Sequence, residues 1–213
     1  MAQRQVMIVG DGDFAFTKEI VEHFQHISST STTELHTSIF LERREAIERY
    51  KGGSILDHLE TLRGHGIQHA FAVDATRLAE TAAWKGKESC NTIIWTYPFP
   101  ESNAVGIETK HCLVKSFFAS VKHWPSFKAD GTIVIGLKSC TTTARHINKD
   151  EDYQLKQWQV LDAAKEEGFH QVSDFGPVYP FWRATHVCGR ALFKEKDRQK
   201  VTIKFYAFKA DME

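Results

Sequence analysis

The sequence of 213 residues predicts an α/β protein with a Rossmann-like, doubly wound sheet of seven strands, mostly parallel with an antiparallel C-terminal hairpin. Short apolar runs with strand character alternate with segments whose apolar residues follow the helical period. The first run, residues 6–10, passes directly into a turn that contains two glycines and is followed by a predicted helix. No linker or internal repeat divides the chain, so we expect a single domain over residues 1–213.

The first half of the chain predicts three strands separated by helical segments. Strands are expected over residues 6–10, 35–41 and 67–73. Apolar residues recur at helical spacing over 15–26, and a second helix is expected over 55–63, where glycines follow it. A charged stretch, residues 42–51, follows the second strand.

The second half predicts two more strands, two helices and a terminal hairpin. Strands are expected over 92–96 and 132–137, with a helix over 108–123 between them. A further helix over 153–167 ends at Gly168, a residue suited to the C-cap. Two β-like runs, 187–193 and 201–208, predict an antiparallel pair at the edge of the sheet.

Composition predicts a folded globular protein. Hydrophobic residues make up 42% and charged residues 25%, while 27 basic residues balance 27 acidic ones. A net charge of zero gives no bulk attraction for nucleic acid, although a local basic patch stays open. The four cysteines form no C-x-x-C motif, so we expect neither a zinc site nor a disulfide framework. The absence of a signal-peptide pattern or a membrane-length apolar run favours an intracellular protein.

The turn Gly10-Asp11-Gly12-Asp13-Phe14 is the strongest candidate binding site. Glycine has no Cβ, so the backbone can bend sharply and approach a ligand closely. Such a loop after the first strand of an open α/β sheet is where nucleotides and nucleoside-containing cofactors bind.

Ala15 replaces the third glycine of the dinucleotide fingerprint, which weakens a nicotinamide interpretation without excluding it. The two aspartates would repel a pyrophosphate, whereas they suit a cationic sulfonium. We therefore predict S-adenosylmethionine as the ligand of this loop. The alternative is a tight turn in which an aspartate only caps the helix.

Two further acids follow strands at positions where Rossmann-like sites hold a nucleoside. Glu42, after the second strand, is a candidate for the ribose hydroxyls. Asp74, beside Ala75 and after the third strand, is a candidate acceptor for an adenine amino group. A structural role stays open for both acids: a solvated helix start for Glu42 and a helix cap for Asp74.

Motifs along most of the chain resemble one known family. Gly-Asp-Gly-Asp-Phe-Ala-Phe at 10–16 and Asp-Ala-Thr at 74–76 are similar to motifs of the 25S rRNA (uridine-N(3))-methyltransferase-like domain family. Further positions that follow this family's order are Thr37-Ser38, Lys51, Gly66, Ile93-Ile94, Pro98, Phe117-Phe118, Gly131, Leu137-Lys138, Tyr153, Trp158 and Gly168.

The resemblance implies a class I methyltransferase fold and S-adenosylmethionine as the methyl donor. It further implies ribosomal RNA as the partner, with uridine N(3) as the acceptor. The location that it implies is the cytoplasm or the nucleus, including the nucleolus.

The sequence departs from the family pattern beside the predicted site. The family reads Asn-Phe-Pro-His after the fourth strand, where this chain reads Thr96-Tyr97-Pro98-Phe99, and Phe40 stands in place of the family's acid near the second strand. Two alternatives stay open. One is a methyltransferase for a small molecule or another acceptor, and the other is a non-catalytic Rossmann-like binding module.

The loop after the fourth strand faces the reactive methyl group in this fold. We therefore assign Tyr97 and Pro98 to the cofactor pocket and Phe99 to the substrate. Tyr97 is also the catalytic candidate. Glu101 and Asn103 are polar alternatives, because a uracil acceptor needs a base or hydrogen bonds that favour its deprotonated ring.

A second substrate candidate lies near the C-terminus. Tyr179, Trp182 and Arg183 combine aromatic faces with a cation, the chemistry that stacks nucleic-acid bases, while aromatic packing at the sheet edge is the alternative. The local excess of basic residues over 190–204 fits a solvated hairpin better than an RNA patch. The histidines at positions 58, 65 and 69 match no metal motif and are expected in a solvated loop. We predict no metal or membrane partner, and the oligomeric state stays open.

Overall fold

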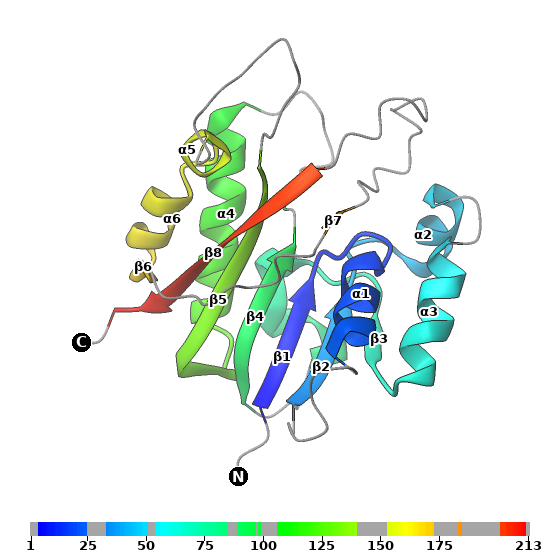
Figure 1. Ribbon diagram of the computed structural model, residues 1–213. Coiled ribbons are helices and arrows are strands. Elements are labelled where there is room, and N and C mark those ends of the chain that lie inside the picture. The colour runs from blue at the N-terminus through cyan, green and yellow to red at the C-terminus, as the bar shows by residue number, and fades with distance from the viewer. Residues whose placement is uncertain are drawn as a thin grey trace.

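A computed structural model describes residues 4–24, 33–50, 54–84, 89–96, 98, 106–139, 153–172, 183–184 and 201–211. A mixed β-sheet crosses the molecule and has helices on both faces (Figure 1). The strands are β1 (Arg4–Val9), β2 (Thr33–Ser38), β3 (Gln68–Ala70), β4 (Cys90–Thr96), β5 (Phe127–Ser139), β6 (Phe169–Val172), β7 (Arg183–Ala184) and β8 (Val201–Ala210). The helices are α1 (Ala15–Phe24), α2 (Arg43–Arg49), α3 (Ser54–Gly64), α4 (Ile107–Lys122), α5 (Tyr153–Gln157) and α6 (Val160–Glu166), with 3-10 segments η1 (Ala75–Glu80) and η2 (Ala82–Trp84).

The strand order is β3-β2-β1-β4-β5-β8-β6, with the two-residue β7 paired to β8 off this path. Strands β1 to β5 are mutually parallel, and β8 is antiparallel to both β5 and β6. After β1 the chain adds β2 and β3 on one side of the sheet, then returns to place β4 and β5 on the other. The order therefore reverses between β1 and β4. Open α/β sheets bind ligands in the crevice outside the carboxyl ends of such a strand pair.

The two faces of the sheet have separate cores, because successive side chains of a strand point to opposite faces. On β1, Met7 and Val9 belong to the larger core with α4, α5 and α6, whereas Ile8 packs with Phe16 and Ile20 of α1. The same alternation continues on β4 and β5. Burial on both faces explains why these strands are nearly continuous apolar runs in the sequence.

The predicted fold class is confirmed by this topology and by the long antiparallel strand at the C-terminal end. The strands predicted over 6–10, 35–41, 67–73, 92–96 and 132–137 correspond to β1 to β5. Their bounds differ by a few residues, and β3 keeps only three residues of its predicted range. Helices α1, α3 and α4 also lie where helical spacing predicted them.

The C-terminal strands agree with the prediction in part, because the run predicted over 201–208 forms β8 and is antiparallel to its neighbours. Strand β8 lies between β5 and β6, so it is inside the sheet rather than at its edge. Its antiparallel neighbour β6 was not predicted, because four residues that directly follow Gly168 are too few for an alternating pattern to stand out. The predicted partner run 187–193 lies outside the described residues.

Two helical segments also differ from the prediction. The helix expected over 153–167 is divided into α5 and α6, because Gln159 adopts a left-handed conformation with φ of 47°. The charged stretch 42–51 contains a helix, α2, whose apolar contacts to the core come from the buried Ala46 and the partly buried Ile47. A seven-residue helix with one buried side chain leaves little periodic signal.

Candidate functional site

The loop after β1 is bonded to both neighbouring strands where the sheet order reverses. The backbone N–H of Asp11 donates to the Ser38 carbonyl at the end of β2 over 3.1 Å. The hydroxyl of Thr96, at the end of β4, donates to the Gly10 carbonyl over 3.2 Å. The loop is therefore fixed in the crevice where the fold favours ligand binding.

Both glycines of the loop have backbone conformations that disfavour a side chain. Gly10 and Gly12 have φ values of 71° and 65°. A Cβ on Gly10 would lie 3.0 Å from Nε1 of Trp95, so this indole backs the loop directly. Among the described residues, a Cβ on Gly12 would have only the Tyr50 hydroxyl within 4 Å, at 3.4 Å. Gly12 therefore leaves its backbone accessible to a ligand.

Phe14 also has a left-handed backbone, with φ of 67°. Its side chain is fully buried and packs edge-on against Phe71 and His69, with ring centroids 5.6 and 5.9 Å away. Left-handed strain of about 1–3 kcal/mol is comparable to the gain from burying such a ring. Phe14 was assigned to the cofactor, and its side chain is part of the core, so a ligand role for it stays a prediction.

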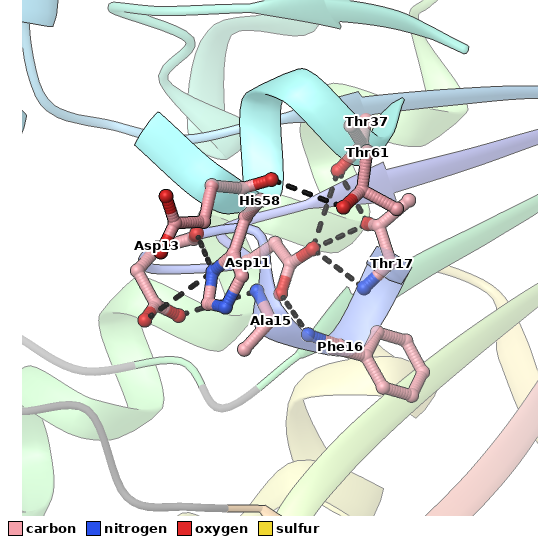
Figure 2. A network of polar contacts seen from close by, with 9 residues as sticks. Asp11, Asp13, Ala15, Phe16, Thr17, Thr37, His58 and Thr61 are labelled. Atoms are coloured by element: carbon pink, nitrogen blue, oxygen red, sulfur yellow. Dashed lines mark hydrogen bonds and ion pairs between the residues drawn. The ribbon is translucent and has the colours of Figure 1, made fainter. Parts of the chain in front are cut away.

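The carboxylate of Asp11 is turned inward and caps α1 (Figure 2). It accepts hydrogen bonds from the backbone N–H of Phe16 (3.1 Å), from the backbone N–H of Thr17 (2.9 Å) and from the Thr17 hydroxyl. The hydroxyls of Thr17 and Thr37 lie 2.7 Å apart, which extends this network to β2. Burial raises the pKa of Asp11 to about 7 even though these hydrogen bonds oppose the shift. The capping alternative therefore describes this side chain.

Asp13 is also engaged by the protein. It is 3% exposed, and its carboxylate accepts the backbone N–H of Ala15 over 3.2 Å. Nδ1 of His58, on α3, lies 2.8 Å from the Asp13 carbonyl oxygen and 3.7 Å from its carboxylate (Figure 2). Burial raises the pKa of Asp13, and the adjacent imidazole opposes that rise. Neither aspartate is therefore a free charge for a ligand, because both carboxylates accept backbone hydrogen bonds that hold the shape of the loop.

Two of the three histidines predicted in a solvated loop lie in regular secondary structure instead. His58 is on α3, and His69 is on β3 with its pKa lowered by burial. His65 follows α3 in the turn before β3, as expected from its neighbouring glycines. Among the described residues, no group of three His, Cys, Asp or Glu side chains is placed to hold a metal ion.

The acids predicted to hold the nucleoside differ in their surroundings. Asp74 is half-buried and caps η1 by accepting the backbone N–H and hydroxyl of Thr76, at 2.9 and 2.7 Å. Ala75, next to it, is buried in the core. Glu42 is exposed at the N-cap of α2 and makes no side-chain cap hydrogen bond. Asp74 is thus a helix cap and Glu42 a solvated residue at a helix start, as the structural alternatives predicted. The roles of both acids in binding a nucleoside stay predictions.

Residues of the fourth-strand loop are described only in part. Thr96 is 2% exposed and supports Gly10, and Pro98 is buried. Arg183 lies on β7, where its backbone pairs with Thr202 of β8. The other candidates lie outside the described residues: Tyr97, Phe99, Glu101, Asn103, Tyr179 and Trp182.

The residues around the loop fit the predicted ligand in two respects. The open side of Gly12 allows close approach to the backbone, as a nucleoside-containing ligand requires. Phe40 is 50% exposed two residues beyond Ser38, to which the loop is bonded, so its ring is a candidate surface for an adenine ring. Sequence reasoning did not identify Trp95, Tyr50 and His58 as supports of the loop. Only strand register and helix packing bring them to it.

Comparisons with known proteins identify the family of this chain. The sequence model of the BMT5-like family, described as rRNA (uridine-N3-)-methyltransferase BTM5-like, matches residues 7–177. A comparison with curated proteins finds no match.

Solved structures show the fold. The chain is similar to a 16S rRNA (adenine(1408)-N(1))-methyltransferase with cosubstrate SAM from Catenulisporales acidiphilia, with a TM-score of 0.53 and 10% identity over 99% of this chain and 87% of that one. It is also similar to LepI in complex with SAM, with a TM-score of 0.51 and 10% identity over 98% of this chain. The chain spans 43% of LepI. At such identities the likeness is one of fold, the class I methyltransferase fold.

The family match begins within β1 and covers the glycine loop and strands β2 to β6. The predictions of the methyltransferase family and of its fold are thereby confirmed. The protein belongs to the BMT5-like family of rRNA (uridine-N3-)-methyltransferases.

Proposed function

We propose that this chain transfers a methyl group from S-adenosylmethionine to N(3) of a uridine in ribosomal RNA. The observation that carries the proposal is the glycine loop at the point where the sheet order reverses, within a chain that matches this family over residues 7–177. The solved 16S rRNA methyltransferase with SAM shares the fold and gives the proposal further support. Such an acceptor fits a protein of the nucleolus or the cytoplasm, where ribosomal RNA is made and used.

S-adenosylmethionine supplies an electrophilic methyl group. In an in-line displacement the N(3) lone pair forms the bond to the methyl carbon while the carbon–sulfur bond breaks, and the N(3) proton passes to a base or to solvent. Positioning supplies much of the acceleration in such a reaction. The chain contributes a loop that is bonded to Ser38 and to Thr96, with the Gly12 backbone open to the donor.

The acceptor base must lie on the methyl side of this crevice. The hydroxyl of Thr96 donates to the Gly10 carbonyl, which places the end of β4 beside the glycine loop. The residues that follow Thr96 are therefore the nearest in sequence to the methyl side of the crevice. We propose Tyr97 and Phe99 as the residues that line it. We also propose that Tyr179, Trp182 and Arg183 bind RNA by stacking and charge.

Two measurements test the proposal with the full chain. Calorimetry with S-adenosylmethionine is expected to show binding, with NADH as the comparison. Incubation with methyl-labelled donor and unmodified ribosomal RNA is expected to label the RNA, and mass spectrometry of its nucleosides is expected to identify N(3)-methyluridine.

Other outcomes would overturn the proposal in distinct ways. Binding of NADH in place of S-adenosylmethionine would contradict the methyl donor. Label in a metabolite extract but not in RNA would indicate a small-molecule acceptor. Donor binding without transfer to RNA or metabolites would indicate a binding module that has kept the fold.

A further inference from the structure

We propose that His58 is a positioning residue for the glycine loop, and that it acts by holding the peptide group between Asp13 and Phe14. The inference rests on the proposed binding of S-adenosylmethionine by that loop. His58 lies on α3, 45 residues further along the chain than Asp13, and no sequence motif connects the two.

The direction of the hydrogen bond follows from its partners. Nδ1 of His58 lies 2.8 Å from the Asp13 carbonyl oxygen, and a carbonyl oxygen only accepts. The proton is therefore on Nδ1, and His58 is the donor. The same nitrogen is 3.7 Å from the Asp13 carboxylate, so one side chain contacts both the backbone and the side chain of Asp13.

Charge around His58 favours this arrangement. The Asp13 carboxylate faces it from the loop, and Glu19 interacts with it from α1. The His58 side chain is 15% exposed and that of Asp13 is 4% exposed, so solvent screens their interaction weakly. Without His58, Asp13 would keep a buried carboxyl group and lose its neighbouring donor.

The hydrogen bond from His58 reaches the part of the loop whose backbone conformation is least favourable for an L-residue. Gly12 and Phe14, on either side of Asp13, both have left-handed backbones. The orientation of the Asp13 carbonyl is set by the rotation that carries Phe14 into its left-handed conformation. An L-residue leaves that conformation readily unless other contacts hold it. His58 is thus the side chain on α3 that keeps the loop in the shape in which Gly12 is accessible.

The test uses paired substitutions in the full chain, with calorimetric affinity for S-adenosylmethionine as the main measurement. His58→Leu removes the donor and is expected to weaken binding about tenfold, the effect of losing one well-formed hydrogen bond. His58→Asn keeps an N–H near the position of Nδ1 and is expected to restore affinity to within about threefold of the unaltered protein. Equal loss in both variants would overturn the proposed donor role.

Two controls separate positioning from stability. Leu59→Val, at the next position of the same helix, trims a side chain that is 2% exposed and is expected to lower the melting temperature with affinity unchanged. His123→Leu removes a histidine whose Nδ1 donates to the Ala119 carbonyl over 2.7 Å on α4, and it is expected to leave affinity unchanged. Affinity measured where circular dichroism shows every variant folded keeps the comparison valid.

The failures of the two proposals are distinguishable. If the unaltered protein binds no S-adenosylmethionine, the proposed function fails. If it binds and His58→Leu binds equally well, or if Leu59→Val loses affinity in proportion to stability, the role of His58 in positioning the loop is wrong.

Discussion

The side-chain hydroxyl of Thr96 donates a 3.2 Å hydrogen bond to the carbonyl oxygen of Gly10, which joins the end of β4 to the start of the glycine loop. Thr96 is 2% exposed, and the neighbouring Trp95 indole lies against Gly10. From the sequence, position 96 is part of the substrate loop and departs from the family pattern there. In the structure its hydroxyl supports the loop that we assign to the methyl donor.

Replacing Thr96 with valine tests this support. Valine has nearly the same shape but no hydroxyl, so the Gly10 carbonyl loses its donor. We expect the free energy of unfolding to fall by about 1 kcal/mol and the affinity for S-adenosylmethionine to fall several-fold. Thr96→Ser keeps the hydroxyl and serves as the control. Denaturant unfolding and calorimetry measure the two effects, and unchanged values for valine would show that the hydrogen bond is dispensable.

Gly12 and Gly66 allow a matched test of the loop. Both have positive φ, at 65° and 69°, but Gly66 lies in the turn before β3, at the amino ends of the parallel strands, whereas Gly12 follows the carboxyl end of β1. Valine at either position therefore introduces similar backbone strain. Gly12→Val is expected to abolish binding of S-adenosylmethionine, because the side chain projects into the crevice, whereas Gly66→Val keeps it. Calorimetry with S-adenosylmethionine on both folded variants measures the difference. Retained affinity for S-adenosylmethionine in Gly12→Val would show that the loop is only a turn.

The buried Asp11 predicts a specific pH dependence of stability. Its pKa is raised to about 7 from an ordinary value of 3.8 because burial disfavours the charged carboxylate. Between these two values the unfolded chain has released the proton and the folded protein has kept it. The stability that Asp11 contributes is therefore complete below about pH 4 and is lost as the pH rises through 7, at no more than about 1.4 kcal/mol per pH unit.

Asp11→Asn isolates this contribution, because asparagine does not titrate. We expect the stability difference between the unaltered protein and Asp11→Asn to shrink as the pH rises from 5 to 7.5. Urea unfolding at a series of pH values measures it. A difference that stays constant or grows over this range would contradict the raised pKa.

A side chain at Gly131 is expected to disturb packing in β5 without affecting the candidate site. A Cβ at this position would lie 2.7 Å from Cζ of Phe127 and 2.8 Å from the Lys128 carbonyl oxygen. Gly131→Ala is therefore expected to lower the free energy of unfolding by about 1–3 kcal/mol. Gly64→Ala is the control, since no described atom outside its chain neighbours and its own helix backbone lies within 4 Å of its Cβ. Thermal unfolding compares the two, and equal melting temperatures would show that β5 relaxes without cost.

The sequence by itself determined the order of elements and the glycine loop. Buried parallel strands such as β1 and β4 are apolar on both faces, and the turn after β1 needs residues without a Cβ, so both features are visible locally. The motif order from the loop to Asp74-Ala75-Thr76 likewise identified the family that the sequence comparison confirms. Short elements such as β6 and α2 were missed because a few residues carry too little periodicity.

Only the tertiary structure decided what the side chains of the loop do. From the sequence, Asp11 and Asp13 were interpreted as charges available to a ligand. In the structure the Asp11 carboxylate caps α1, and Asp13 contacts His58. Packing also placed Trp95 and Thr96 of β4 beside Gly10. These partners are far apart in the chain and meet through strand register and helix packing. A carboxylate's role depends on whether folding leaves it in solvent or surrounds it with donors, and that is a property of the assembled core.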